Sequence, residues 1–315
     1  MFFLKKYLPQ IFIAILIKEN EQIFKAKIYR NKNLISTQEK TFNDEKKLLE
    51  HIKKLSKKYL IYYIGLFLNN QEQGLIPDLN TNNLEKFNIG KMSVKYLPLN
   101  NAQIYIATEH IEYFNELFEE YSGIDFLYSP FALLYYHISK RNLSLEKTIL
   151  YIHNYDNFLT LMICKGKDIL FGDYKVFEKN TTQGNIEDQS DSLDDELLFS
   201  KEKEELDMQE NSEFLDSENK ESVLQNDIDF KELNSFSHDM EICNYIFSSI
   251  QKFYNDDKYS NNFIDELVFF SDKEFSLATF EVIENEIFLE PKFEKIDTLN
   301  WMITLMQEEL NSYEI

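Results

Sequence analysis

A pattern of three short apolar runs separated by tight polar turns occurs twice in this chain and constrains its fold more than any other feature. In the second copy the pattern predicts strands over residues 148–152, 158–164 and 168–176, with the first turn at 153–157. The first copy spans residues 11–42 and has the same arrangement. Two copies about 140 residues apart predict a duplicated fold in which each half begins with three antiparallel strands.

The residues after each copy continue with alternating helices and strands. In the first half, an amphipathic pattern predicts a helix after Asn43, and the apolar run 60–68 predicts a strand buried on both faces and parallel to its neighbour. Strands at 91–97, 103–107 and 124–128, a helix at 108–121 and a helix beginning at Ser129-Pro130 follow. In the second half we expect a helix at 240–253, strands at 263–272 and around 287–289, and a last helix at 298–310, whose apolar stripe completes the second half.

The chain is strongly acidic, with a net charge of −22 over 315 residues, and this charge argues against binding to a nucleic-acid backbone. Much of the charge is local, because residues 187–232 contain 18 acidic residues and four lysines. This segment also lacks the apolar residues needed to offset the entropy of folding. We therefore predict three regions: residues 1–145 as a first half, residues 146–178 plus 234–315 as a second half, and residues 179–233 as an acidic, disordered insertion.

Few motifs in the chain indicate metal or redox chemistry. Cys164 and Cys243 lie in apolar surroundings and are predicted to be buried thiols rather than a disulfide or a metal site. The five histidines show no metal-ligand spacing, so no metal ligand is predicted. The apolar run at 11–17 lacks a cleavage site and fits a core strand better than a signal peptide. No other run approaches the roughly 20 residues of a membrane-spanning helix, and a cytoplasmic location is expected.

The order of elements resembles the actin-like (ribonuclease-H-like) fold, an α/β fold with two mixed sheets that are each led by a three-stranded antiparallel unit and flanked by helices. Within that superfamily the chain looks most like the cytoplasmic components of type IV pilus, type II secretion and competence machines, PilM and the cytoplasmic part of GspL. The resemblance rests on the two hairpin-led halves and on SPFALLYYHI after IDFLYS at the end of the first half. It implies a location at the inner face of the inner membrane.

Actin-like ATPases place an acid and a glycine after the first strand of each half, where they hold Mg²⁺ and phosphates. In this chain the matching positions are occupied by Leu16 and Lys18 in the first half and by Tyr151 and His153 in the second. Asp156 supplies an acid only in a shifted register, with no glycine beside it. The chain has only seven glycines and no Gly-Gly pair. We therefore expect no catalytic residues and no cofactor, and interpret these four positions as a degenerate nucleotide site.

Three functional hypotheses remain open from the sequence. The preferred one is a non-catalytic scaffold that binds protein partners of a secretion, pilus or DNA-uptake platform, either a membrane protein's cytoplasmic segment or the assembly ATPase, in a groove between the first-half sheet and its helices. The second is a divergent actin-like ATPase or small-molecule kinase. The third is an acidic adaptor that binds a basic partner through its disordered insertion. In each case membrane association is expected through partners.

Overall fold

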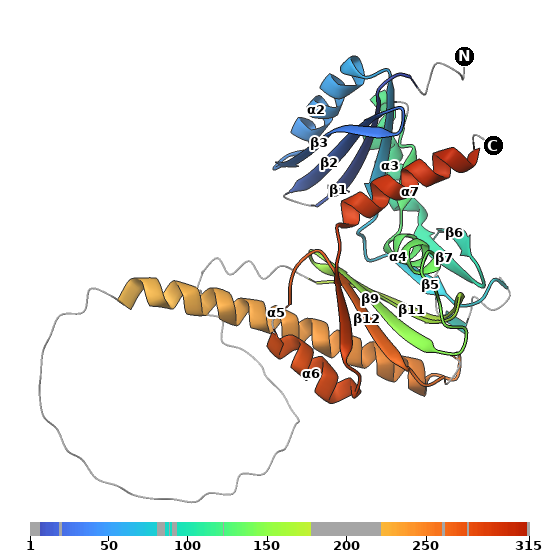
Figure 1. Cartoon of the computed structure of the whole chain (residues 1–315), viewed down its shortest axis with the longest axis vertical. Coiled ribbons are helices and arrows are strands. Elements are labelled where there is room, and N and C mark those ends of the chain that lie inside the picture. Colours follow the sequence, from blue (N-terminus) through green and yellow to red (C-terminus); the bar gives the residue numbers. More distant parts are fainter. Residues whose placement is uncertain are drawn as a thin grey trace, which may run out of the picture. The chain divides into compact units, whose positions relative to one another are not determined.

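The computed structural model describes residues 7–18, 21–80, 86–87, 89, 93–121, 123–177, 222–259, 262–275 and 277–313, and the side chains of residues 222–236, 277 and 313 fall outside this description. Contacts divide the chain into one unit made of residues 1–178 and 237–315 and a second unit made of residues 179–236. All the sheets belong to the first unit (Figure 1). Of the predicted insertion at 179–233, residues 179–221 lie outside the described residues.

The first half is built on a five-stranded mixed sheet with the strand order β3-β2-β1-β4-β8. Strands β1, β2 and β3 form the antiparallel unit. β4 pairs with β1 in parallel, as predicted from the buried apolar run, and β8 pairs with β4 in parallel. The bounds are β1 Gln10–Ile17, β2 Gln22–Arg30, β3 Asn33–Phe42, β4 Ile61–Phe67 and β8 Phe126–Tyr128.

Helix α2 (Glu45–Lys58) connects β3 to β4 and buries its apolar stripe against one face of the first sheet. Its cap is Asp44, whose carboxylate accepts from the Lys46 backbone N–H at 2.9 Å, rather than the predicted Asn43. Helix α4 (Pro130–Ser139) begins as predicted, with Ser129 as the cap and Pro130 at the first position. Both helices therefore begin within one residue of the position expected from capping chemistry.

The second half repeats this architecture with the strand order β11-β10-β9-β12-β13. Again three antiparallel strands are followed by two that add in parallel. The bounds are β9 Thr148–Tyr155, β10 Phe158–Lys165, β11 Asp168–Val176, β12 Glu266–Ser271 and β13 Pro291–Lys295. Helices α5 (Ser222–Asn255) and α6 (Leu277–Ile287) belong to this half, and the described part of α5 packs with α6 on one face of the sheet. The duplicated fold predicted from the sequence is confirmed.

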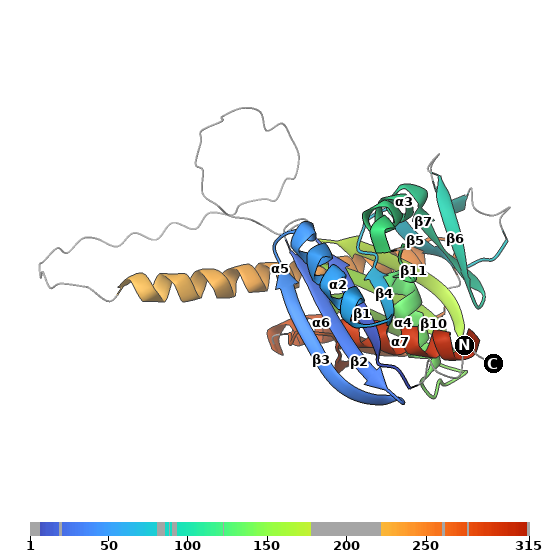
Figure 2. The same ribbon diagram turned by 90° about the horizontal axis from the view of Figure 1, so that it is seen from above.

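A small three-stranded sheet is inserted in the first half between β4 and β8. It has the order β5-β7-β6 and is followed by α3 (Thr108–Leu117) and a short 3-10 helix, η2 (Glu119–Tyr121) (Figure 2). Its strands are β5 Gln73–Ile76, β6 Val94–Leu99 and β7 Ala102–Ala107. The predicted strands at 91–97 and 103–107 thus exist with shifted bounds. β5 falls in a polar stretch that the sequence did not identify as a strand.

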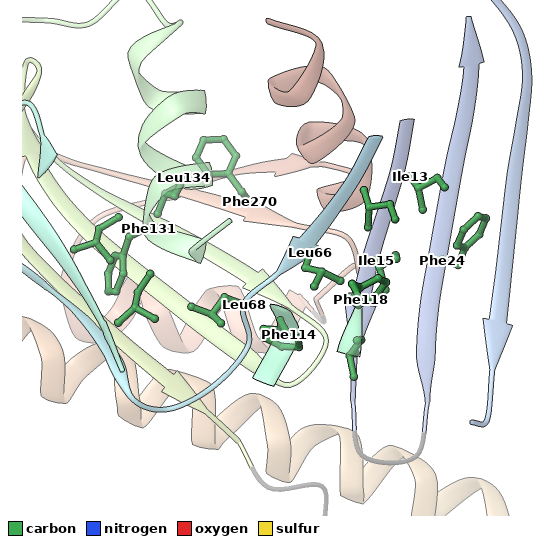
Figure 3. Packing of buried hydrophobic residues seen from close by; sticks show 14 of the residues in the cluster. Ile13, Ile15, Phe24, Leu66, Leu68, Phe114, Phe118, Phe131, Leu134 and Phe270 are labelled. Carbon is green, nitrogen blue, oxygen red and sulfur yellow. The ribbon is translucent and has the colours of Figure 1, made fainter. Parts of the chain in front are cut away.

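The last helix of each half packs on the sheet of the other half. Helix α7 (Thr298–Tyr313) buries Leu299, Met302, Ile303 and Met306, as the apolar stripe predicts, but the stripe packs mainly on β1, β2 and β4 of the first sheet rather than on the sheet of its own half. Helix α4 reciprocally packs on β10 of the second sheet. Figure 3 shows the cluster that contains α4, in which Ile13 and Phe24 of the first sheet, Phe131 and Leu134 of α4 and Phe270 of β12 belong to one core. This exchange joins the halves through apolar contacts.

The structure also tests four other predictions from the sequence. The predicted strand at 287–289 is wrong, because Ile287 ends α6 and the strand is β13, which starts at Pro291. The predicted turn at 153–157 is also too long, because β9 continues to Tyr155. Cys164 and Cys243 are buried and free, as predicted. Among the described residues, no helix is long and apolar enough to cross a membrane.

Candidate functional site: the junction between the two hairpin turns

The candidate site lies where the carboxyl ends of the parallel strands of both halves come together. β1 ends at Ile17 and is followed by Lys18, whereas β9 ends at Tyr155 and is followed by Asp156. In open α/β sheets, ligands bind outside the carboxyl ends of the strands. We call this region the junction, and it consists of the Lys18–Asp156 ion pair with its neighbours Glu21 and Lys273, together with the hydrogen-bonded side chains of His153, Asp272 and Thr298.

An ion pair closes the junction between the two hairpin turns. Lys18 Nζ lies 2.7 Å from Asp156 Oδ2, and the two side chains are only 10% and 14% exposed. Lys18 also contacts Glu21 at 3.2 Å, and its backbone N–H donates to the Glu21 carbonyl at 3.0 Å, which closes the first turn. Lys273 Nζ approaches the other Asp156 oxygen at 3.8 Å. Side chains from both halves therefore occupy and neutralise the position between the turns.

Below this pair, a chain of hydrogen bonds links the end of β9 to the ends of β12 and β13. Thr298 Oγ1 donates to Asp272 Oδ1 at 2.5 Å, and the Thr298 backbone N–H donates to Asp272 Oδ2 at 2.9 Å. His153 Nε2 lies 2.9 Å from the same hydroxyl. Because Thr298 uses its proton on Asp272, it accepts from His153, and the imidazole therefore carries its proton on Nε2.

Burial sets the protonation states in this chain of hydrogen bonds. His153 is fully buried, and this burial lowers its pKa to about 3. The charge of the nearby His137 makes a smaller contribution in the same direction. Burial also raises the pKa of Asp272 to about 6, against the opposing effect of its bonds from Thr298. His153 is therefore neutral near pH 7 and acts as a hydrogen-bond donor. Its Nδ1 atom has no partner within the described part of the chain.

A second set of charges braces the start of α7. Asp297 caps this helix, since its carboxylate accepts from the Asn300 N–H at 2.9 Å, and it also pairs with Lys25 of β2. Lys25 is 7% exposed and also pairs at 2.7 Å with Glu39, its register partner on β3. Burial lowers the pKa of Lys25, but the hydrogen bonds to Asp297 and Glu39 outweigh it, so the pKa is raised. A buried cation of the first half thus holds the helix that arrives from the second half.

The space left beside these groups is a polar cleft of about 490 Å³. Its lining includes Lys25, Tyr155, Asp272, Asp297 and Leu299. The three carboxylates Asp156, Asp272 and Asp297 are each bound by a residue of this chain. Neither hairpin turn contains a glycine at which a phosphate could approach the backbone. Within the described ranges, no three His, Cys, Asp or Glu side chains are grouped so as to hold a metal ion.

The four residues predicted to replace a nucleotide site fall into two groups. Leu16 is fully buried and packs in the cluster under α7, and Tyr151 is 2% exposed and packs in the cluster that contains α4. These two are core residues on the sheet faces that receive the exchanged helices. Lys18 and His153 belong to the junction, where each makes a polar contact. That these positions descend from a nucleotide site stays a prediction.

Sequence reasoning missed the residues contributed by β2 and by the strand ends of the second half, namely Lys25, Asp272, Asp297 and Thr298. Asp297-Thr298 has the residue types of a helix start, which could have identified the cap of α7. Asp272 directly follows an apolar strand and could have been assigned to a carboxyl edge. Lys25 had no such signal, because its partners are distant in sequence.

Comparisons with known proteins agree with the observed architecture. The PilM of a PilM–PilN type IV pilus biogenesis complex matches with 8% identity, over 92% of this chain and 89% of that chain, with a TM-score of 0.53. A Bacteroides thetaiotaomicron VPI-5482 protein described as having an actin-like ATPase fold and unknown function matches with 11% identity, over 96% and 98% of the two chains, with a TM-score of 0.49. No curated protein matches the sequence. With two equivalent mixed sheets and the exchanged helices, the chain has the duplicated actin-like fold.

Two family profiles match separate parts of the chain, one in each half. Residues 7–135 match a domain of unknown function, DUF8569. Residues 150–311, which are just over half of the sequence, match another domain of unknown function, DUF8341. On this match, the chain belongs to the DUF8341 family.

Proposed function

We propose that this chain is a non-catalytic actin-like scaffold of an inner-membrane assembly of the type II secretion, type IV pilus or DNA-uptake class. In this role it binds a partner's cytoplasmic segment or the assembly ATPase at the cytoplasmic face of the membrane. The observation that carries the proposal is the Lys18–Asp156 ion pair, which fills the space between the two hairpin turns. The likeness to the fold of PilM, solved in complex with PilN, supports the pilus or secretion context.

The ion pair bears on catalysis because phosphate binding needs free donors between the turns. A nucleotide would have to displace Asp156 from Lys18 and leave a largely buried carboxylate without its nearest cation, at a cost typical of a broken buried pair. The exchanged helices and the Lys25–Asp297 pair hold the halves together without a ligand. The fold therefore supplies a rigid platform, which is what a scaffold needs.

One observation favours the alternative, a divergent ATPase or small-molecule kinase. Asp272 lines the cleft of about 490 Å³, and burial raises its pKa to about 6, a value suited to a general base. Thr298 already binds both oxygens of Asp272, however, so the carboxylate is held by this chain's own residues.

Calorimetric titration of the full chain with MgATP at millimolar concentration tests the proposal. We expect no saturable heat and no phosphate release. As a control, Asp272→Asn should behave like the unmodified chain. Saturable binding that Lys18→Ala changes, or phosphate release that Asp272→Asn abolishes, would favour the enzyme hypothesis instead.

A further inference from the structure

An open apolar groove lies on the outer side of the second half, between α5 and the end of α6, two helices that lie close together in Figure 1. Its volume is about 290 Å³. Phe247, Ile250, Tyr254 and Ile264 line it, and Phe263 and Phe288 stand at its edge with 77% and 88% of their surfaces exposed. We call this region the Phe288 groove. Two exposed phenylalanines beside an apolar hollow are unusual on a chain with so many charges.

Phe288 has a left-handed backbone conformation, which makes its exposed aromatic side chain unusual. Phe288 follows the last residue of α6 and has φ 59°, in the left-handed region, and its N–H donates to the Glu284 carbonyl at 2.8 Å. This is the helix-ending geometry that normally uses glycine, because a bulky side chain is strained there. Burial of the ring does not compensate for the strain, since the side chain is exposed. An aromatic residue kept in a strained, exposed position points to a role outside the fold itself.

The floor of the groove is held in place by hydrogen bonding. The Ile264 N–H donates to Tyr254 Oη at 2.9 Å, which ties the segment before β12 to α5. The Phe263 ring lies 6.4 Å from the Tyr254 ring. The floor of the groove is therefore attached to α5 and is formed before any partner binds, which lowers the entropic cost of binding.

The charges around the groove indicate the chemistry of its occupant. Glu286 lines the groove, and Glu284 and Glu290 lie within four residues of Phe288 in the sequence; all three are exposed, and none forms an ion pair within the described part of the chain. A second copy of this chain would bring like charges together, which is unfavourable. An apolar centre with an acidic edge is complementary to apolar side chains flanked by lysine or arginine.

We propose that the Phe288 groove binds an amphipathic segment of a partner protein, one with bulky apolar side chains on one face and flanking Lys or Arg residues. This inference rests on the proposed scaffold role, for which it names the docking surface and the partner's chemistry. Segments next to the cytoplasmic end of a membrane helix are rich in Lys and Arg. A helical segment would insert its apolar side chains beside Phe263 and Phe288 and place its cations over the glutamates.

The test uses a fluorescently labelled synthetic peptide with Leu and Phe on one helical face and Lys on the flanks, titrated with the full chain. A second peptide has the same apolar residues and Glu in place of Lys. We expect the basic peptide to bind, the acidic one not to bind, and salt to weaken the binding. Phe288→Gly and Phe263→Ser should each weaken it by roughly tenfold or more, as expected for aromatic anchors.

Phe288→Gly separates binding from folding, because glycine suits the left-handed backbone and the variant should unfold at a higher temperature than the unmodified chain. The matched control is Lys32→Gly, which removes an exposed side chain at φ 66° in a distant turn and should leave peptide binding unchanged. Absence of peptide binding, equal binding of the acidic peptide, or unchanged binding by Phe288→Gly would overturn the proposal. Self-association that depends on Phe288 would assign the groove to a second copy and also overturn it.

The outcomes also separate this inference from the proposed function. If the peptide binds at the groove while MgATP is hydrolysed, the scaffold proposal fails and the groove remains. If neither nucleotide nor peptide binds, the groove proposal fails and the non-catalytic role stands.

Discussion

The junction and the Phe288 groove differ in the burial and pairing of their side chains. In the junction, Lys18 and Asp156 pair across the two halves and are largely buried. In the groove, two phenylalanines are exposed beside glutamates that form no ion pair within the described residues. The charged groups of the junction are thus paired with each other, whereas the apolar and acidic side chains of the groove are exposed to solvent. Under the proposed function, the place where α/β folds usually bind ligands is structural in this chain, and the surface that binds a partner lies elsewhere.

The largest effect on stability is expected from breaking the ion pair in the junction. Lys18→Ala removes the cation that lies 2.7 Å from the largely buried Asp156 carboxylate, whereas Lys273 lies at 3.8 Å, and should lower the free energy of unfolding by about 2–3 kcal/mol. Adding Asp156→Ala should recover part of the loss, which denaturant unfolding in a double-mutant cycle would measure. Lys140→Ala, which breaks an exposed pair with Glu308, is the control and should cost less than about 1 kcal/mol. Equal losses for the two lysines would remove the distinction between the junction and the surface.

The next effect concerns pH. The pKa of Asp272 is raised to about 6, so the folded state holds this proton more tightly than the unfolded state, and stability from Asp272 is lost as pH rises from about 4 to 6. The pKa of His153 is lowered to about 3, so the unfolded state takes up its proton first, and stability is lost as pH falls from about 6.5 to 3. The two contributions therefore oppose each other between about pH 4 and 6.

Asp272→Asn should unmask the histidine contribution. Its free energy of unfolding should fall more steeply with acidification between pH 6 and 4 than that of the unmodified chain, by up to about 1.4 kcal/mol per pH unit. Urea unfolding at a series of pH values measures this slope. Parallel slopes for the two proteins would mean that Asp272 does not hold its proton in the folded junction.

In the groove we expect a smaller change in the free energy of unfolding, and a gain in stability rather than a loss. Phe288→Gly should raise the free energy of unfolding by about 0.5–1 kcal/mol, because it relieves the left-handed strain and uncovers little buried surface. Thermal unfolding measures the change. A loss of stability would show that the Phe288 ring supports the fold, and the contrast between the two regions would weaken.

The smallest effect is expected from removing residues 187–232. The folded core should keep its unfolding midpoint, because the sheets and their core clusters use residues outside this segment. Binding of the basic peptide should fall less than in Phe288→Gly, since only the general acidic field is reduced. If binding is lost entirely, the acidic segment and not the groove is the partner site.

The sequence predicted the duplicated fold because hydrophobic periodicity is local, and the Ile11 and Thr148 copies both show it plainly. It did not predict that α7 and α4 exchange sheets, since an apolar stripe shows that a face is buried but not against what. His153 was assigned to a turn because it is polar, whereas it lies inside β9 and its Nε2 atom bonds to the Thr298 hydroxyl. β5 was missed because it is short and lies in a polar stretch.

The candidate site was only partly predictable. Lys18 and His153 were found because a resemblance gave their positions, but their partners Asp156 and Thr298 could be connected to them only through the folded structure. Phe288 was taken as part of a strand, because its aromatic character favours β structure and nothing in the sequence marks a left-handed helix end without glycine. The residues that depend on long-range contacts or unusual backbone are thus those that the sequence did not identify.

The contrast between the junction and the Phe288 groove is tested most directly by thermal unfolding of the full chain, measured once with MgATP and once with the basic amphipathic peptide. A ligand that binds the folded state raises the midpoint of unfolding. The account predicts that the peptide raises the midpoint and MgATP leaves it unchanged, and that Phe288→Gly loses the peptide's effect. A midpoint raised by MgATP and not by the peptide would contradict it.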